Sequence, residues 1–246
     1  STGKVITHSK KVKTGLMQKL FLGEITRDWR EKFVKTTGKE FLKIICEQII
    51  KEQENNQKII NGVIKKKHQS LEVFEDAEPK INIPKEWVWC RLSDLMIYLT
   101  DYHSNASYEL LKKHVTLLDQ PNYANMIRST NFEKNNFDSL MKYISKNAYD
   151  FLWKSQLYGG EILIGKIGNA GAVYHMPYLQ KPSSLAMNLF AIKISNVINS
   201  KYVYYHLLSN FSKQNISQYM NGVSTLSIDK KSVRSLWIAL PPLPEQ

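Results

Sequence analysis

The chain ends in an apolar run of β type that is closed by a proline segment. Residues 236–240 read Leu-Trp-Ile-Ala-Leu, and residues 241–244 read Pro-Pro-Leu-Pro. Proline has no N–H donor and a fixed φ, so a sheet ladder cannot continue through this segment. The pattern therefore predicts a strand over 236–240, and Glu-Gln follows where a helix could begin.

Another pattern, rich in glycine, lies earlier in the chain. Residues 160–171 read Gly-Glu-Ile-Leu-Ile-Gly-Lys-Ile-Gly-Asn-Ala-Gly. Gly and Asn tolerate positive φ, so the turn predicts a hairpin between strands. Apolar spacing elsewhere predicts further strands and helices. We expect an α/β (α+β) fold, a mixed-sheet globular domain with an N-terminal helical appendage. The expected strands are 113–118, 140–144, 161–167, 171–174 and 187–194, and the expected helices are 9–22, 39–67 and 200–217.

The charge of the chain favours a polyanionic partner. The formal net charge is +12, and residues 162–228 contain no Asp or Glu. A solvated surface normally mixes both signs of charge, so this stretch suggests a face that must not repel phosphates. The alternative is a buried, strand-rich core, in which charged residues of either sign are scarce because they are costly to bury.

Enzymatic and membrane functions receive little support from the sequence. No apolar run has transmembrane length, and no Cys/His cluster has zinc spacing. Cys46 and Cys90 lie in different contexts, and we interpret them as free thiols of a cytoplasmic protein. Asp76, Glu78 and Lys80 have the spacing of some nuclease sites, but they lie in a polar segment that reads as a linker. We therefore expect no catalytic residue, metal ligand or bound cofactor.

Several motifs, taken in order, resemble the specificity (S) subunit of type I restriction–modification systems. Residues 13–25, Lys-Thr-Gly-Leu-Met-Gln-Lys-Leu-Phe-Leu-Gly-Glu-Ile, look like the end of its spacer helix. Thr-Arg-Asp-Trp-Arg at 26–30 and Pro-Lys-Glu-Trp-Val-Trp at 84–89 are similar to its link into a recognition domain. The glycine-rich segment 160–171, Asn221-Gly222 and residues 240–246 are similar to motifs that follow later in that family, and they occur in the same order.

The resemblance implies a domain plan and a set of partners. Residues 1–38 would be the end of the spacer helix and a turn, 39–68 an amphipathic helical segment, 69–82 a linker, and 83–246 the target-recognition domain. The family reads duplex DNA, one half of a bipartite target for each domain. Methyltransferase (modification) subunits and a restriction subunit would perform the chemistry, and S-adenosylmethionine, ATP and magnesium would belong to them. A full subunit carries two recognition domains, so this chain looks like a fragment or a half-length subunit.

Candidate DNA-binding residues lie in four polar segments. A tight turn, a proline-bounded loop, a polar insertion and a Gly/Ser/Thr loop can present amides, hydroxyls and cations to phosphates or base edges. For each segment the alternative is an ordinary turn, cap or solvated surface. The candidates are Lys166 and Asn169 in the turn; Lys181, Ser183 and Ser184 in the proline-bounded loop; Asn125 and Arg128 in the insertion; and Ser224, Thr225, Lys230 and Lys231 in or after the Gly/Ser/Thr loop.

Two other functions remain open at this stage. The chain could be the recognition domain of a single-chain restriction–methylation enzyme, or a helical adaptor that does not bind DNA. A catalytic domain fused in the same gene would distinguish the first alternative. Binding to a defined DNA sequence would exclude the second.

Overall fold

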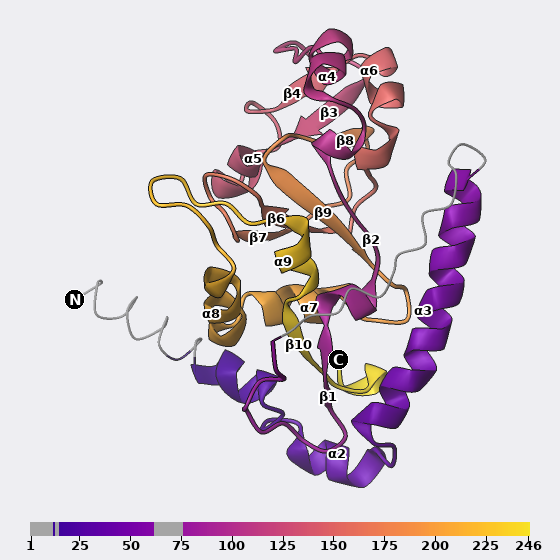
Figure 1. The fold of residues 1–246 in the computed structure, drawn as a ribbon, viewed down its shortest axis with the longest axis vertical. Coiled ribbons are helices and arrows are strands. Elements are labelled where there is room, and N and C mark those ends of the chain that lie inside the picture. Colours follow the sequence, from indigo (N-terminus) through magenta and orange to yellow (C-terminus); the bar gives the residue numbers. More distant parts are fainter. Residues whose placement is uncertain (1–11, 13–14, 62–75) are drawn as a thin grey trace. The chain divides into compact units, whose positions relative to one another are not determined.

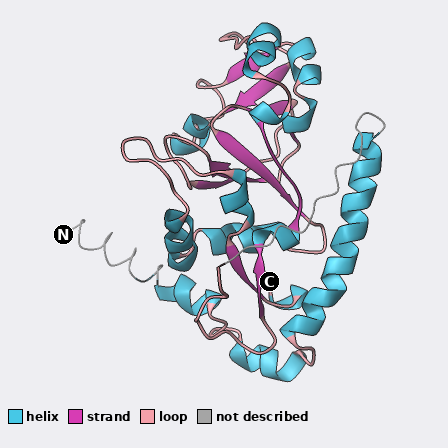
Figure 2. Ribbon diagram, in the orientation of Figure 1, coloured by secondary structure: helices cyan, strands magenta, loops and turns pink. Residues whose placement is uncertain are grey.

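The computed structural model describes residues 12, 15–61 and 76–246, which form two compact units. The first unit contains the described residues up to Ile97, together with Ser195–Gln218 and Val233–Gln246. The second contains Tyr98–Ile194 and Tyr219–Ser232. Both units combine helices with short strands (Figure 2), so the expected mixed α/β class is confirmed. In the described part of the chain, no helix has both the length and the apolarity needed to cross a membrane.

The predicted C-terminal strand is the centre of the first unit. β10(Trp237–Leu240) pairs antiparallel with β1(Val88–Arg91), with Val88 opposite Leu240 (Figure 1). Trp87, Trp89 and Ala239 are buried together. Beyond the prolines, the chain forms the 3-10 helix η4(Leu243–Glu245). η1(Leu92–Leu95), α7(Ser200–Leu207) and α8(Asn210–Gln218) complete this part of the unit.

The N-terminal helices belong to this first unit. Residues 15–21 are helical, and α2(Arg27–Phe33) and α3(Gly38–Asn61) follow. Phe21 is buried, and its ring meets the rings of Tyr202 and His206 edge-on. On α3 the side chain of Gln53 donates to the carbonyl oxygen of Met96 at 2.7 Å. The predicted helices 9–22 and 39–67 are confirmed over these described residues, and the remainder of each lies outside them.

His206 is a buried histidine that holds α7 against β10. Its Nε2 accepts a hydrogen bond from the backbone N–H of Ala239 at 3.1 Å, so the proton of the neutral ring is on Nδ1, which lies 3.0 Å from Ser212 Oγ. Burial lowers the pKa of His206 to about 3. The ring therefore stays neutral in the folded protein at pH values where it is protonated in the unfolded chain.

This burial predicts a pH dependence of stability. Below an unfolded pKa of about 6.5, unfolding takes up one proton at His206, so the free energy of unfolding should fall by about 1.4 kcal/mol per pH unit towards pH 3. Urea unfolding of the wild type and of His206→Gln across this range measures the effect. The variant should lose this part of the slope, and His114→Gln, at an exposed position, controls for removing a histidine. Equal slopes for wild type and His206→Gln would contradict the assignment.

The second unit contains two four-stranded sheets. One has the order β2(Met96–Asp101), β9(Leu189–Ile194), β6(Ile162–Gly165) and β7(Val173–His175), and the first two residues of β2 belong to the first unit. The other has the order β4(Lys142–Ile144), β3(Ala124–Ile127), β8(Ser183–Leu185) and β5(Gln156–Leu157). β3 and β8 are parallel, whereas β3–β4, β5–β8, β6–β7 and β6–β9 are antiparallel. The expected mixed sheet is therefore present.

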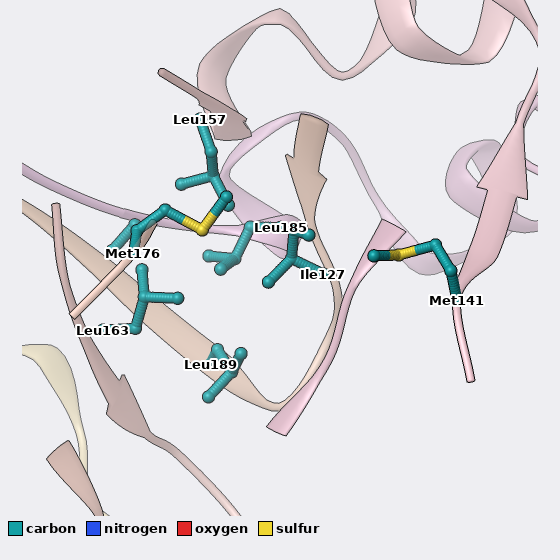
Figure 3. Packing of buried hydrophobic residues seen from close by; sticks show 8 residues of the cluster. Ile127, Met141, Leu157, Leu163, Met176, Leu185 and Leu189 are labelled. Atoms are coloured by element: carbon teal, nitrogen blue, oxygen red, sulfur yellow. The ribbon is translucent and has the colours of Figure 1, made fainter. Parts of the chain in front are cut away.

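Apolar side chains from both sheets share one core in this unit. Leu163 and Leu189 come from the first sheet, and Ile127 and Leu185 from the second; Figure 3 shows them with Met176, which is also buried. A separate cluster contains buried residues of η2(Tyr102–Ser104), α4(Tyr108–His114) and α6(Lys146–Phe151), together with residues of β3 and β4. The other short helices are α5(Ser129–Glu133), η3(Trp153–Ser155) and α9(Lys230–Arg234), and the last two residues of α9 belong to the first unit.

Two element predictions are wrong. The strand expected at 113–118 is replaced by the end of α4, and only Leu118 makes an isolated antiparallel bridge, to Tyr143. Lys112, Lys113 and His114 end α4 and suit the negative end of a helix dipole, so the apolar run begins only after the helix. The helix expected over 200–217 is two helices. α7 ends at Leu207, and Ser209 precedes α8, where its Oγ accepts from the N–H of Ser212 at 3.2 Å. The predicted hairpin is confirmed, and the strand predicted over 187–194 is confirmed over 189–194.

Candidate nucleic-acid interface

The glycine-rich segment forms a tight turn between β6 and β7. The N–H of Gly171 donates to the carbonyl oxygen of Gly165 at 2.8 Å, and Gly168 and Gly171 have φ of +84° and +75°. A Cβ on Gly165 would lie 2.0 Å from the carbonyl oxygen of Asn169. Glycine is therefore required at these positions, because other residues would meet strain or backbone. The exposed Asn169 amide is held by Tyr174 Oη at 3.1 Å and Glu133 Oε1 at 3.2 Å.

An exposed loop runs beside this turn. Residues 221–226 are all exposed, and Asn221 and Ser227 close the loop with two backbone hydrogen bonds of 2.9 and 2.8 Å. Gly222 has φ of +109°. Ser227 bridges to Ile167, and the N–H of Ile228 donates to the carbonyl oxygen of Lys166 at 3.1 Å. The turn and the loop, side by side in Figure 1, therefore form one surface of the second unit.

A buried carboxylate connects the bases of the turn and the loop. Asp101, at the end of β2, accepts from Lys166 Nζ at 2.8 Å and from Lys230 Nζ at 2.7 Å. Burial disfavours the charged carboxylate, but hydrogen bonds from Lys166, Lys230 and Ser104 outweigh this effect and hold the pKa of Asp101 well below its ordinary value. The carboxylate is therefore ionised at neutral pH, and both ammonium groups are paired with it.

An open pocket of about 620 Å³ lies over this ion-pair cluster. Lys166 and Lys230 contribute positive charge to its lining, and Asp101 and Asp229 contribute negative charge. The sequence carries no local signal for Asp101, because its two lysine partners lie 65 and 129 positions further along the chain.

The predicted binding residues fall into three groups, which differ in their exposure and in their distance along the fold from the turn and the loop. Asn169, Ser224, Thr225 and Lys231 are exposed at the turn, the loop or the start of α9. Lys166 and Lys230 are half-buried and paired with Asp101. The third group, Lys181, Ser183, Ser184, Asn125 and Arg128, lies elsewhere in the unit.

Asn125, Ser183 and Ser184 were expected in loops, and that expectation is wrong. They lie on β3 and β8, where Asn125 is opposite Ser183, and all three side chains are buried. Ser184 Oγ donates to the carbonyl oxygen of Ser155 at 3.2 Å. Pro182 misled the prediction because it precedes the strand instead of interrupting it, and its carbonyl oxygen accepts from the N–H of Asn125 at 2.8 Å.

Arg128 and Lys181 are also engaged within the second unit. Arg128 precedes α5, and its Nη2 donates to the carbonyl oxygen of Leu140 at 2.6 Å. Lys181 Nζ lies over the ring of Tyr143, 4.8 Å from its centroid.

Asp76, from the segment with nuclease-like spacing, pairs with Arg91 through both carboxylate oxygens, each at 2.9 Å. Among the residues described, no three His, Cys, Asp or Glu side chains gather as a metal site, and Cys46 and Cys90 are not joined by a disulfide.

The acid-free stretch 162–228 contributes both the turn and the loop of this surface. Its residues 195–218 belong to the first unit, so it does not form one continuous patch of the second. Acids from other segments also reach it, since Asp101 pairs with Lys166 and Glu133 contacts Asn169. The absence of acids along the chain therefore does not give an acid-free surface in space.

Residues 84–246 match the family model of the type I restriction modification DNA specificity domain. The chain belongs to this family. The matched range includes β1, β10 and the whole second unit, with the turn and the loop described above. Curated protein sequences give no significant match to this specificity domain.

Solved structures similar to this specificity domain are longer chains. One comes from work on complex assembly and conformational transition of the type I R-M system, with 16% identity, a TM-score of 0.48, and coverage of 84% of this chain and 45% of that chain. The HsdS subunit from Thermoanaerobacter tengcongensis has 18% identity, a TM-score of 0.47, and coverage of 83% and 45%. The S subunit of a type I restriction–modification system from M. genitalium has 13% identity and a TM-score of 0.38. That match covers 63% of this chain and 34% of that chain. The chain thus spans less than half of each.

Proposed function

We propose that this chain recognises a specific duplex DNA sequence, one half of a bipartite target, as part of the specificity subunit of a type I restriction–modification system. The family match over residues 84–246 carries the proposal. The net charge of +12 supports a polyanionic partner. In this proposal the chain performs no chemistry, and modification and restriction subunits use S-adenosylmethionine, ATP and magnesium.

We propose that the turn 166–171 and the loop 221–226 face the DNA. Exposed amides and hydroxyls in rigid turns can bond to phosphates and base edges without the entropy cost of ordering a flexible segment. Ser224 and Thr225 supply hydroxyls, and Asn169 supplies its amide oxygen, because its amide nitrogen donates to Tyr174 and Glu133. Lys231, at the start of α9, adds an exposed ammonium. Any phosphate contact made by Lys166 or Lys230 must compete with Asp101, so we assign these two lysines to the base of the surface.

The remaining predicted residues have a supporting place in this proposal. Asn125, Ser183 and Ser184 are buried inside the second sheet, and Arg128 and Lys181 interact within the unit. We therefore leave these five residues out of the direct DNA contacts. They shape the scaffold on which the turn and the loop are held.

We propose that the N-terminal helices bind the modification subunits. Leu16 and Leu20, and Ile44 and Ile50 on α3, are exposed apolar side chains. Apolar residues on the exposed side of a helix are typical of surfaces that pack against a partner. In this proposal, residues 1–38 and 39–68 are the helical docking part, 69–82 a linker, and 83–246 the recognition domain, although the described helices share the first unit with β1 and β10.

The salt dependence of binding tests this proposal. The chain, assembled with its modification subunits, should enrich one sequence motif from randomised DNA duplexes. Lys231→Ala should then reduce the slope of log K against log salt by about 0.9, because one phosphate contact is lost. Lys112→Ala, at an exposed position of α4, should leave the slope unchanged. Enrichment of no motif by the wild type would contradict DNA recognition, and an unchanged slope for Lys231→Ala would remove that residue from the interface.

A further inference from the structure

Asp101 is ion-paired to one lysine from each of two segments of this surface. Lys166 is the first residue of the turn, and Lys230 begins α9, separated from the loop 221–226 by residues 227–229. Each ammonium contacts a different oxygen of Asp101, at 2.8 and 2.7 Å. Ser104 Oγ donates to Asp101 Oδ1 at 2.7 Å and accepts from Lys230 Nζ at 2.7 Å. The Asp101 side chain is only 5% exposed, so water competes little for these bonds.

The geometry requires a charged acceptor with two oxygens at this position. An asparagine has nearly the same shape, but its amide nitrogen is a donor, so one of the two ammonium groups would face another donor. A glutamate keeps the charge and both oxygens and moves them by one methylene. The two half-buried ammonium groups also repel each other unless an anion lies between them. The carboxylate therefore fixes the distance between Lys166 and Lys230.

We infer that Asp101 is a positioning residue for DNA recognition, which fixes the loop 221–226 relative to the turn 166–171 without touching DNA. This inference rests on the proposed function. Backbone hydrogen bonds join the two segments only at their bases, through Ile167, Ser227 and Ile228. Asp101 adds the only described side-chain carboxylate that is ion-paired to both Lys166 and Lys230. The relative placement of two reading segments determines which base edges they reach together, so the expected effect is on sequence discrimination.

The test compares Asp101→Asn with Asp150→Asn. Asp150, on α6, is exposed and pairs with Lys146 at 2.6 Å, so its substitution changes the net charge equally without disturbing the surface. Binding of the assembled protein is measured for a duplex carrying the enriched motif and for the same duplex with the motif scrambled. Asp101→Asn should reduce the ratio of the two affinities by roughly tenfold, about the discrimination of one base pair. Asp150→Asn should leave the ratio unchanged, and Asp101→Glu should restore part of it.

The outcomes separate this inference from the proposed function. If the wild type does not discriminate between the two duplexes, the proposed function fails and the inference fails with it. If the wild type discriminates and Asp101→Asn keeps the same ratio, only the inference fails. The inference would also be overturned if Asp101→Asn bound both duplexes more tightly by the same factor and its log K fell more steeply with log salt. Asp101 would then merely mask two phosphate-binding lysines. If Asp101→Asn does not fold, Lys230→Met, which leaves Asp101 paired with Lys166, takes its place with the same expected loss of ratio.

Discussion

Replacing Arg30 by methionine is expected to lower the free energy of unfolding of the first unit by about 3–5 kcal/mol, the usual cost of removing one partner from a buried ion pair. Arg30 is buried, and its Nη1 donates to Glu245 Oε1 at 2.7 Å and to the carbonyl oxygen of Gly23 at 3.0 Å. Its Nε lies 3.4 Å from Glu86 Oε2. Without the guanidinium, the buried carboxylate of Glu245 would lose its ion-pair partner, and Glu86 would keep only the exposed ammonium of Lys85, at 4.0 Å.

Urea unfolding followed by tryptophan fluorescence measures this effect, because Trp29, Trp87, Trp89 and Trp237 all belong to the first unit. Arg27→Met is the matched control. Arg27 is an exposed residue of the same helix, one turn earlier, so its replacement should change stability by less than about 0.5 kcal/mol. A similar, small loss for both variants would show that Arg30 does not hold the N-terminal helices to the C-terminal segment.

Local sequence chemistry predicted the elements whose signals lie within a few residues. The prolines after Leu240 limited the final strand, and Gly168 and Gly171 specified a hairpin turn that only positive φ can close. The helical stripe of α3 was also visible, because its period is local. The family resemblance added the domain type, which the match over residues 84–246 confirms.

Long-range pairing was outside the reach of the sequence. Asn125 and Ser183 have polar side chains that suit loops, yet parallel pairing of β3 with β8 buries both and lets them bond to each other at 3.4 Å. Asp101 carried no motif, and its role follows only from two lysines that the fold brings to its two oxygens. Charge counting along the chain failed for the same reason, since it missed acids contributed by other segments.

If this chain recognises DNA as proposed, the loop 221–226 is expected to lie on the bound duplex. Val223 is fully exposed, so a photoreactive phenylalanine analogue at this position should not disturb the fold. Lys112 on α4 is the control position: it is also exposed, and α4 packs beside α6, away from the β6–β7 turn (Figure 1). Both substituted chains are assembled with the modification subunits, bound to the duplex that carries the enriched motif, and irradiated.

The position of the cross-links on the DNA is the deciding measurement. The analogue at position 223 should cross-link to the duplex at one place within or beside the motif, and scrambling the motif should abolish that single position. The analogue at position 112 should give no cross-link. A bound complex in which position 223 gives no cross-link, or in which position 112 cross-links equally well, would contradict DNA recognition by this surface.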